Sequence, residues 1–137
     1  MKTIIVDDEI MAIKLVRNYL ERDKRVEIVG ECLDAGEALQ CVRERAVEAA
    51  FLDICIHGCM DGVELGKKLK ELNPQIVLIY TTGNAQYVDN AIDVEADFYL
   101  MKPLNAAELT FVVKKANELA LQRNKRIFAR TFGHFDL

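Results

Sequence analysis

Hydrophobic and polar positions follow two different periods along this chain. Five short runs are almost wholly apolar and rich in β-branched or aromatic residues, as buried strands are, and they cover 3–7, 26–31, 49–54, 75–82 and 97–102. The stretches between them place apolar residues three and four positions apart, which is typical of amphipathic helices near 10–21, 35–46, 62–72, 85–94 and 106–123. The pattern predicts a strand followed by a helix, repeated five times.

Signals for helix starts support this spacing. At three places a residue that caps helices stands three positions before a glutamate, and the Asn73-Pro74 pair predicts the end of the third helix. Strictly alternating strands and helices indicate an α/β fold, a doubly wound parallel sheet with helices on both faces. Ligands of such sheets bind outside the carboxyl ends of the strands. The three predicted caps are Asp34 before Glu37, Asp61 before Glu64, and Asn105 before Glu108.

Length and composition limit the classes of protein that fit. A chain of 137 residues is long enough for one domain with a core and too short for two ordinary ones. We find no run long enough to span a membrane and no secretory signal, so we expect a cytoplasmic protein whose four cysteines are reduced. The net charge of −4 divides into about −7 on the body and +3 on the last seventeen residues, and an acidic body argues against a nucleic-acid surface there.

Polar residues gather where the predicted strands end. A single aspartate after a strand is more often a helix cap than a ligand, but here three carboxylates, two hydroxyls and one ammonium come from four strands. Carboxylates held close repel one another unless a cation lies among them, and an oxygen-rich site of this kind suits Mg²⁺. The residues at this edge are Asp7, Asp8, Asp53, Thr81, Thr82 and Lys102.

Four short motifs at these positions make the chain resemble the receiver domain of two-component response regulators. They are VDDE at 6–9, FLDI at 51–54, TTG at 81–83 and FYLMKP at 98–103. The resemblance covers residues 1–121 and implies a flavodoxin-like (βα)5 fold with strand order 2-1-3-4-5. It also implies a switch that is phosphorylated by a sensor histidine kinase and then acts on an output domain, here one that controls transcription.

The resemblance assigns roles to the residues at the carboxyl edge. Asp53 is expected to accept the phosphoryl group from a phosphohistidine, and Lys102 to neutralise charge on the transferred oxygens. Asp8 is expected to bind Mg²⁺ directly, with Asp7 nearby or bridging through water. Asp53 and the backbone carbonyl of Cys55 complete the ligands that the protein provides.

The resemblance also implies a conformational switch. The family places a small residue after the functional hydroxyl, and Gly83 fits this place if the hydroxyl is that of Thr82. Thr82 is expected to bond a phosphoryl oxygen and draw its loop inward, so that the ring of Tyr99 fills the space this leaves. The change is expected to reach partners, or a second copy of the domain, through the face formed by the fourth helix, the fifth strand and the fifth helix. The peptide bond before Pro103 is expected to be cis.

The loop after the acceptor departs from the commonest family pattern. The segment DICIHGCMDG at 53–62 has no Met-Pro pair and is one residue longer, as in a subset of the family. In the family, side chains two positions after the acceptor and two after the switch hydroxyl govern how water reaches the phosphoryl group. These are Cys55 and Asn84, and we expect Cys55 to prolong the phosphorylated state. Cys55, His57 and Cys59 also suggest a zinc site, but structural zinc uses four ligands and no second cysteine pair follows.

The segment 122–137 differs in character from the domain before it. Basic residues precede an alternating, aromatic-rich stretch that we interpret as a strand without a partner. RTFGHFDL at 130–137 resembles the opening of the winged-helix output domain of transcription activators, and a flexible basic terminus is the alternative. Because no recognition helix is present, we expect no direct DNA binding by this segment.

Two other functions remain open. An aspartyl-nucleophile phosphatase usually has a second acid two residues after the first, and Cys55 occupies that place, so we expect no enzyme acting on outside substrates. An interaction module independent of phosphorylation is the other alternative, although every expected site residue is present.

Overall fold

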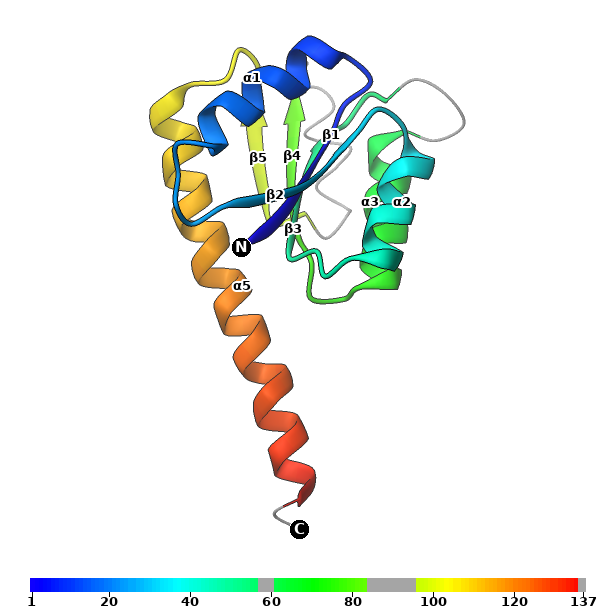
Figure 1. The fold of residues 1–137 in the computed structure, drawn as a ribbon, viewed down its shortest axis with the longest axis vertical. Helices are drawn as coiled ribbons and strands as arrows, with labels where there is room; N and C mark the ends of the chain where they lie inside the picture. Colours follow the sequence, from blue (N-terminus) through cyan, green and yellow to red (C-terminus); the bar gives the residue numbers. More distant parts are fainter. Residues whose placement is uncertain (57–60, 84–95, 136–137) are drawn as a thin grey trace.

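The computed structural model describes residues 1–56, 61–83 and 96–135, with backbone only for 125–135. Five parallel strands form one sheet in the order β2-β1-β3-β4-β5, which confirms the predicted flavodoxin-like arrangement (Figure 1). Each predicted strand is present within a few residues of its expected bounds. The strands are β1 (Lys2–Val6), β2 (Glu27–Cys32), β3 (Ala49–Asp53), β4 (Val77–Thr82) and β5 (Phe98–Met101).

Helices cover both faces of the sheet. In Figure 1, α1 and α5 lie on one side of the strands, while α2 and α3 lie on the other. The predicted fourth helix, near 85–94, falls outside the described residues. The helices that are described are α1 (Ile10–Leu20), α2 (Ala35–Glu44), α3 (Gly62–Leu72) and α5 (Ala106–Phe135).

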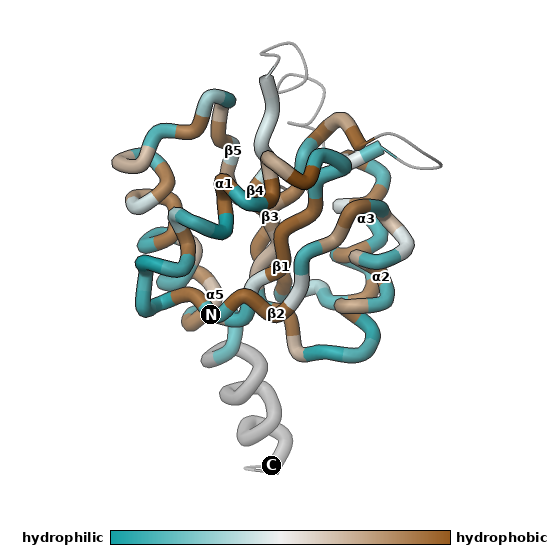
Figure 2. Tube along the Cα trace, turned by 45° about the horizontal axis from the view of Figure 1, so that its top comes forward, coloured by the Kyte–Doolittle hydropathy of each residue, from teal (hydrophilic) through white to brown (hydrophobic). Residues whose placement is uncertain are grey.

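The core is divided by the sheet into two clusters. Successive side chains of a strand point to opposite faces, so Ile4 packs in the cluster with α2 and α3 while Ile5 packs in the cluster with α1 and α5. Leu78 and Ile79 on β4 divide in the same way. Burial on both faces explains why the central strands β1, β3 and β4 are apolar without alternation, and Figure 2 colours the centre of the sheet largely as hydrophobic.

The three predicted helix caps are present. In each case the side-chain oxygen accepts a hydrogen bond from the backbone N–H three residues later, which satisfies one of the donors left unpaired at a helix start. The bonds run from Glu37 to Asp34 (2.8 Å), from Glu64 to Asp61 (2.9 Å) and from Glu108 to Asn105 (3.2 Å).

The start of α3 lies directly against the end of β3. The N–H of Gly62 donates to the carbonyl of Ile54 at 2.8 Å, and a Cβ at position 62 would lie 2.0 Å from the carbonyl oxygen of Asp53. Only glycine allows this approach. The hydroxyl of Tyr80 donates to the Gly62 carbonyl from within the core (3.1 Å). The Asp61-Gly62 pair therefore sets how closely α3 approaches Asp53.

A cluster of charged side chains ties α5 to the residues that precede β4 and β5, at the amino ends of these strands. Arg123 binds Asp97 with a closest distance of 2.6 Å and donates to the carbonyl of Ile76 at 2.9 Å. Lys70 lies 3.5 Å from the same carboxylate, whose Oδ2 also accepts the N–H of Leu78. These side chains are mostly shielded from water, so the contacts fix α5 against β4 and the start of β5.

The end of the chain differs from the prediction. The helix was expected to stop near residue 123 and to be followed by an unpaired strand, but α5 continues to Phe135, so the strand prediction was wrong over these residues. Residues 118–130 are rich in Glu, Leu, Ala, Gln, Lys and Arg and contain no proline, which favours helix. The apparent alternation was misleading because Phe128, Phe132 and Phe135 are also spaced four and three apart, as on one helix face.

No helix within the described ranges has both the length and the apolar composition needed to cross a lipid bilayer.

Candidate functional site

Three carboxylates meet at the carboxyl edge of the sheet. Asp7 and Asp8 follow β1, and Asp53 ends β3, which is the neighbour of β1 in the sheet. One carboxylate oxygen from each residue lies within 4.8 Å of the other two. Since β1 and β3 are parallel, their ends place these side chains together, as the sequence predicted.

The ammonium of Lys102 connects two of these carboxylates. Its Nζ lies 3.1 Å from Oδ2 of Asp7 and 3.3 Å from Oδ2 of Asp53. Lys102 follows β5, so its side chain crosses the end of β4 to reach the site. The side chains of Asp7 and Asp53 are 6% and 12% exposed, and that of Lys102 is 28% exposed. The attraction therefore acts in partly dehydrated surroundings, where it is stronger than on an open surface.

Backbone groups fix the orientation of the two buried carboxylates. The N–H of Glu9 donates to Oδ1 of Asp7 at 2.9 Å, and the N–H of Cys55 donates to Oδ1 of Asp53 at 3.1 Å. The backbone of Asp7 is itself held, because its N–H donates to the carbonyl of Cys32 at the end of β2 (3.1 Å). Each carboxylate thus has one oxygen bonded to the backbone and one facing Lys102.

Burial and the neighbouring charges shift two pKa values in this site. Burial raises the pKa of Asp53, and the nearby Asp7 adds to the rise, while the N–H of Cys55 and the charge of Lys102 oppose it. For Lys102, burial acts to lower the pKa, but the hydrogen bond and charge of Asp7 and the charge of Asp53 outweigh it, so the pKa is raised. Lys102 therefore remains charged at neutral pH.

The donor set fits a divalent cation with a preference for oxygen ligands. Lys102 pairs with Asp7 and Asp53, and Asp8 brings a third carboxylate to the same cluster. Carboxylate oxygens are the ligands that Mg²⁺ takes from proteins, usually one or two of them together with water and phosphate oxygens. The residues present therefore match the predicted magnesium site.

Both threonines lie at the same edge, at the end of β4. Thr81 is the register partner of Asp53 on β3, and Thr82 is the partner of Met101 on β5. Both side chains are buried. The carbonyl of Thr82 accepts the N–H of Lys102 at 2.8 Å, so the backbone of Thr82 lies next to that of Lys102. The structure brings both hydroxyl residues to the cluster, and the choice of Thr82 as the switch residue stays a prediction.

Tyr99 lies on β5 away from the carboxylates. Its ring is half-buried and stacks on that of Tyr80, with 6.1 Å between ring centroids and 23° between ring planes.

The Lys102–Pro103 peptide bond is cis, as predicted. Asn84 lies outside the described residues, as do His57 and Cys59 of the suggested zinc site. The zinc site, which the sequence argued against, therefore stays untested.

Two contributions to the site were not foreseen from the sequence. One is the bond between Lys102 and Asp7, because the sequence indicated only that Lys102 would lie near the phosphoryl group. The other is the carbonyl of Cys32, which holds the backbone of Asp7. A backbone carbonyl is supplied by any residue type, so side-chain identity carries no signal for it.

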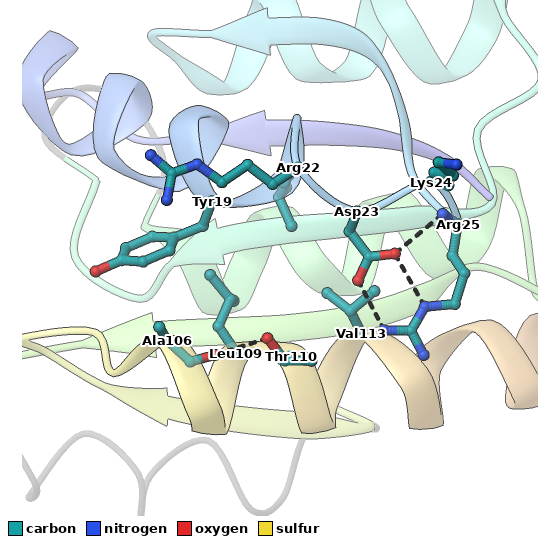
Figure 3. Close-up of a pocket in the computed structure, with 10 residues that line it drawn as sticks. Tyr19, Arg22, Asp23, Lys24, Arg25, Ala106, Leu109, Thr110 and Val113 are labelled. Atoms are coloured by element: carbon teal, nitrogen blue, oxygen red, sulfur yellow. Dashed lines mark hydrogen bonds and ion pairs between the residues drawn. The ribbon is translucent and has the colours of Figure 1, made fainter.

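A separate pocket of about 400 Å³ lies between the end of α1, the loop that follows it and α5 (Figure 3). Its rim includes Arg22 and Lys24 beside the Asp23–Arg25 ion pair, in which the closest atoms are 2.7 Å apart. The hydrogen bonds from Arg25 lower the pKa of Asp23 despite its burial. None of the carboxyl-edge residues lines this pocket, so it is distinct from the candidate site.

Comparison with known proteins agrees with the geometry. A family described as the response regulator receiver domain matches residues 3–114. Among curated proteins, the chain is 31% identical over 115 residues to the sensory transduction protein LytT of Bacillus cereus, which covers 84% of this chain and 46% of that protein. It is 30% identical over 115 residues to the transcriptional regulatory protein YpdB of Escherichia coli, covering 84% and 47% respectively. The chain thus spans about half the length of the curated relatives it matches.

A solved structure also matches the fold. The receiver domain of AraT, a response regulator from Geobacillus stearothermophilus, superimposes with a TM-score of 0.80 and 33% identity, over 90% of this chain and 97% of that one. This chain belongs to the family of response regulator receiver domains and is a receiver of two-component signal transduction.

Proposed function

We propose that Asp53 accepts a phosphoryl group from the phosphohistidine of a sensor histidine kinase, and that phosphorylation switches an output domain that controls transcription. The observation that carries this proposal is the convergence of Lys102 on Asp7 and Asp53, with Asp8 in the same cluster. This arrangement combines a largely buried nucleophile with a positive charge that is already in place beside it.

The proposed transfer uses groups that the site holds in place. A carboxylate oxygen of Asp53 attacks phosphorus, the bond from phosphorus to the kinase imidazole breaks, and the imidazole keeps the electron pair and takes up a proton. The N–H of Cys55 orients the carboxylate through its other oxygen. Lys102 neutralises negative charge on the transferred oxygens, so the site is prepared before the donor arrives.

A magnesium ion bound at this edge would offset the charge of the phosphoryl oxygens. Asp8 and Asp53 are the proposed direct ligands, together with the backbone carbonyl of Cys55. Asp7 and Asp53 both bond Lys102 and a backbone N–H, but the side chain of Asp7 is the more buried (6% against 12% exposed), so its proposed role is to bind the ion through water. The assignment of Asp8 as a direct ligand and of Asp7 as a ligand through water is supported by the burial of Asp7 and the greater exposure of Asp8.

The proposed output surface is formed by the fourth helix together with β5 and α5. A groove of about 510 Å³ lies between β5 and α5, lined by Tyr99, Met101 and Phe111 among others. Met101 and Phe111 are 39% and 59% exposed and line the same groove, so two large apolar side chains lie together where a partner could cover them. A shift of Thr82 toward the phosphoryl group would change the packing of Tyr99 at one end of this groove, which an output domain or a second copy of the receiver would then recognise.

We propose that the chain is not a turnover enzyme and that it acts in the cytoplasm. Position 55, where aspartyl phosphatases carry their general acid, holds a cysteine whose N–H is bonded to the acceptor. The described cysteines are free thiols, in keeping with a reducing compartment. A transcriptional output is favoured by the relative named as a transcriptional regulatory protein, of which this chain matches 47%. An interaction module independent of phosphorylation would not require the complete acidic cluster.

The acceptor can be tested by intact mass after incubation with acetyl phosphate, with and without Mg²⁺. We expect one added phosphoryl group that depends on Mg²⁺ and is lost in Asp53→Ala. Asp34→Asn is the matched control, because it removes a carboxylate remote from the cluster while asparagine still caps α2. A folded wild type that gains no mass from acetyl phosphate or from a phosphohistidine donor would contradict the proposal.

The cation site predicts a change in stability for Asp53→Asn. Because the pKa of Asp53 is raised in the folded protein, its ionised form destabilises the fold at neutral pH, and the variant should gain unfolding free energy. Mg²⁺ at ten times its dissociation constant should add about 1.4 kcal/mol to the wild type and less to the variant. Urea unfolding measures both effects, and equal stabilisation of the two proteins by Mg²⁺ would exclude Asp53 as a ligand.

The two threonines can be separated by the NMR shifts of the Tyr99 to Met101 amides on phosphorylation. Thr82→Val removes the hydroxyl at nearly constant volume, so the shifts should largely disappear while Asp53 is still phosphorylated. Thr82→Ser should keep them, and so should Thr81→Val. Loss of the shifts in Thr81→Val alone would assign the switch to Thr81 instead.

The lifetime of the phosphoryl group should depend on Cys55. Asparagine at this position can both donate to and accept from an attacking water, which a thiol does poorly. Cys55→Asn should therefore speed dephosphorylation by roughly tenfold, or about 1.4 kcal/mol in the barrier, while Cys55→Ala leaves it nearly unchanged. The measurement is the decay of the phosphorylated mass after the donor is removed, and an unchanged rate in Cys55→Asn would refute this role.

A further inference from the structure

Two cysteine sulfurs lie in contact outside the acidic site. Cys32 is the last residue of β2 and is 1% exposed, whereas Cys41 lies on α2 and is only partly buried. Their Sγ atoms are 3.8 Å apart, and the thiol of Cys32 is placed to donate to the sulfur of Cys41. The pair thus joins a buried thiol to one that solvent can reach.

The surroundings of Cys41 leave room for a reagent. An open groove of about 560 Å³ includes Cys41 and Cys32 in its lining, beside Gly30 and Glu37. A Cβ at position 30 would lie 2.9 Å from the sulfur of Cys41, so the absence of a side chain at Gly30 provides the space that this thiol occupies. A small, uncharged oxidant can therefore reach Cys41 while Cys32 stays covered.

We propose that Cys32 and Cys41 form a reversible disulfide when a hydroperoxide reaches Cys41, which gives this receiver a redox-sensitive element. Disulfides of intracellular proteins are commonly transient and sense oxidants, and pairs of this type combine an accessible thiol with a second one nearby that resolves the first product. The proposal does not depend on phosphorylation of Asp53.

The chemistry takes two balanced steps. The thiolate of Cys41 attacks one peroxide oxygen and the O–O bond breaks, which gives a sulfenic acid and an alcohol or water once the leaving oxygen is protonated. The sulfur of Cys32 then attacks the sulfur of Cys41, and the Cys32 proton leaves with the hydroxyl group as water. Two electrons pass from the two thiols to the peroxide, and two molecules of an external thiol such as glutathione return them as they are oxidised to a disulfide.

The geometry and the protonation of the pair suit this order of steps. The sulfurs must approach from 3.8 Å to about 2.0 Å, and Cys41 belongs to a side of α2 that faces an open groove, so the helix can adjust. Burial raises the pKa of the Cys32 thiol, and the neighbouring Cys41 adds to the rise. Cys32 therefore keeps its proton, and its S–H is placed to donate to the sulfur of Cys41.

The bond would join α2 to a strand end that supports the acidic site. The carbonyl of Cys32 accepts the N–H of Asp7, and Cys32 is also the register partner of Val6. Oxidation would therefore restrain the segment that holds the backbone of Asp7. Hydrogen exchange of the α2 and β2 amides should slow in the oxidised protein.

The experiment is peptide mapping of the full chain after treatment with hydrogen peroxide and alkylation of the remaining thiols. No lysine or arginine lies between the two cysteines, so trypsin leaves both on the peptide 26–43, while Cys55 and Cys59 share the peptide 46–67. A second cut after Glu37 separates Cys32 from Cys41 unless a disulfide joins them. We expect peptide 26–43 to lose two hydrogen atoms and its fragments to stay linked until a thiol reductant is added.

Variants test the order of the steps. In Cys32→Ala, Cys41 should stop at the sulfenic acid and be trapped by dimedone, and in Cys41→Ser, Cys32 should remain unoxidised. Cys55→Ser is the control, in which the linked fragments should form as in wild type. The mapping of the wild-type protein decides the matter even if a variant does not fold. Alkylation of both cysteines after peroxide, a sulfinic acid at Cys41 without a link, or a bond confined to peptide 46–67 would overturn the proposal.

Discussion

The ion pairs that Lys102 makes with Asp7 and Asp53 are the interaction on which the site depends. Two carboxylates at the ends of adjacent strands are largely removed from water, and their repulsion would oppose the folded state without a cation between them. Lys102 can reach both only because β5 lies next to β4, and β4 next to β3, in a parallel sheet. Strand order, strand direction and charge are thus mutually consistent at this one edge.

This arrangement keeps the site reactive at a cost in stability. Three carboxylates lie close enough together to hold a cation, and burial raises the pKa of the acceptor, so the ionised acceptor is less stable here than it would be in water. The surrounding backbone resists relaxation of this strain, because Cys32, Glu9 and Cys55 each fix a carboxylate residue by a hydrogen bond. Functional sites are commonly less stable than their scaffold for this reason.

The sequence predicts well those features that depend on a single residue or on its neighbours along the chain. The caps at Asp34, Asp61 and Asn105 and the apolar runs of the strands follow from local rules, and they placed the acidic edge correctly. Contacts that depend on distances across the fold were not predictable in this way, such as the proximity of Cys32 to Cys41, nine positions apart on different elements. The end of α5 was misread because a short aromatic segment fits both the period of a strand and the spacing of a helix.

The length of α5 also has a mechanical consequence. The last described side chains that fasten this helix to the body are Arg123, at Asp97, and Asn124, at Glu48, yet the helix continues without interruption to Phe135. Beyond residue 124 only the backbone of this helix is described, and along it each residue advances the chain by about 1.5 Å and turns it by about 100° about the helix axis. A small rotation of α5 at the sheet would turn its far end in the same direction. One residue inserted between the sheet and that end would rotate any domain attached there by about 100° about the helix axis.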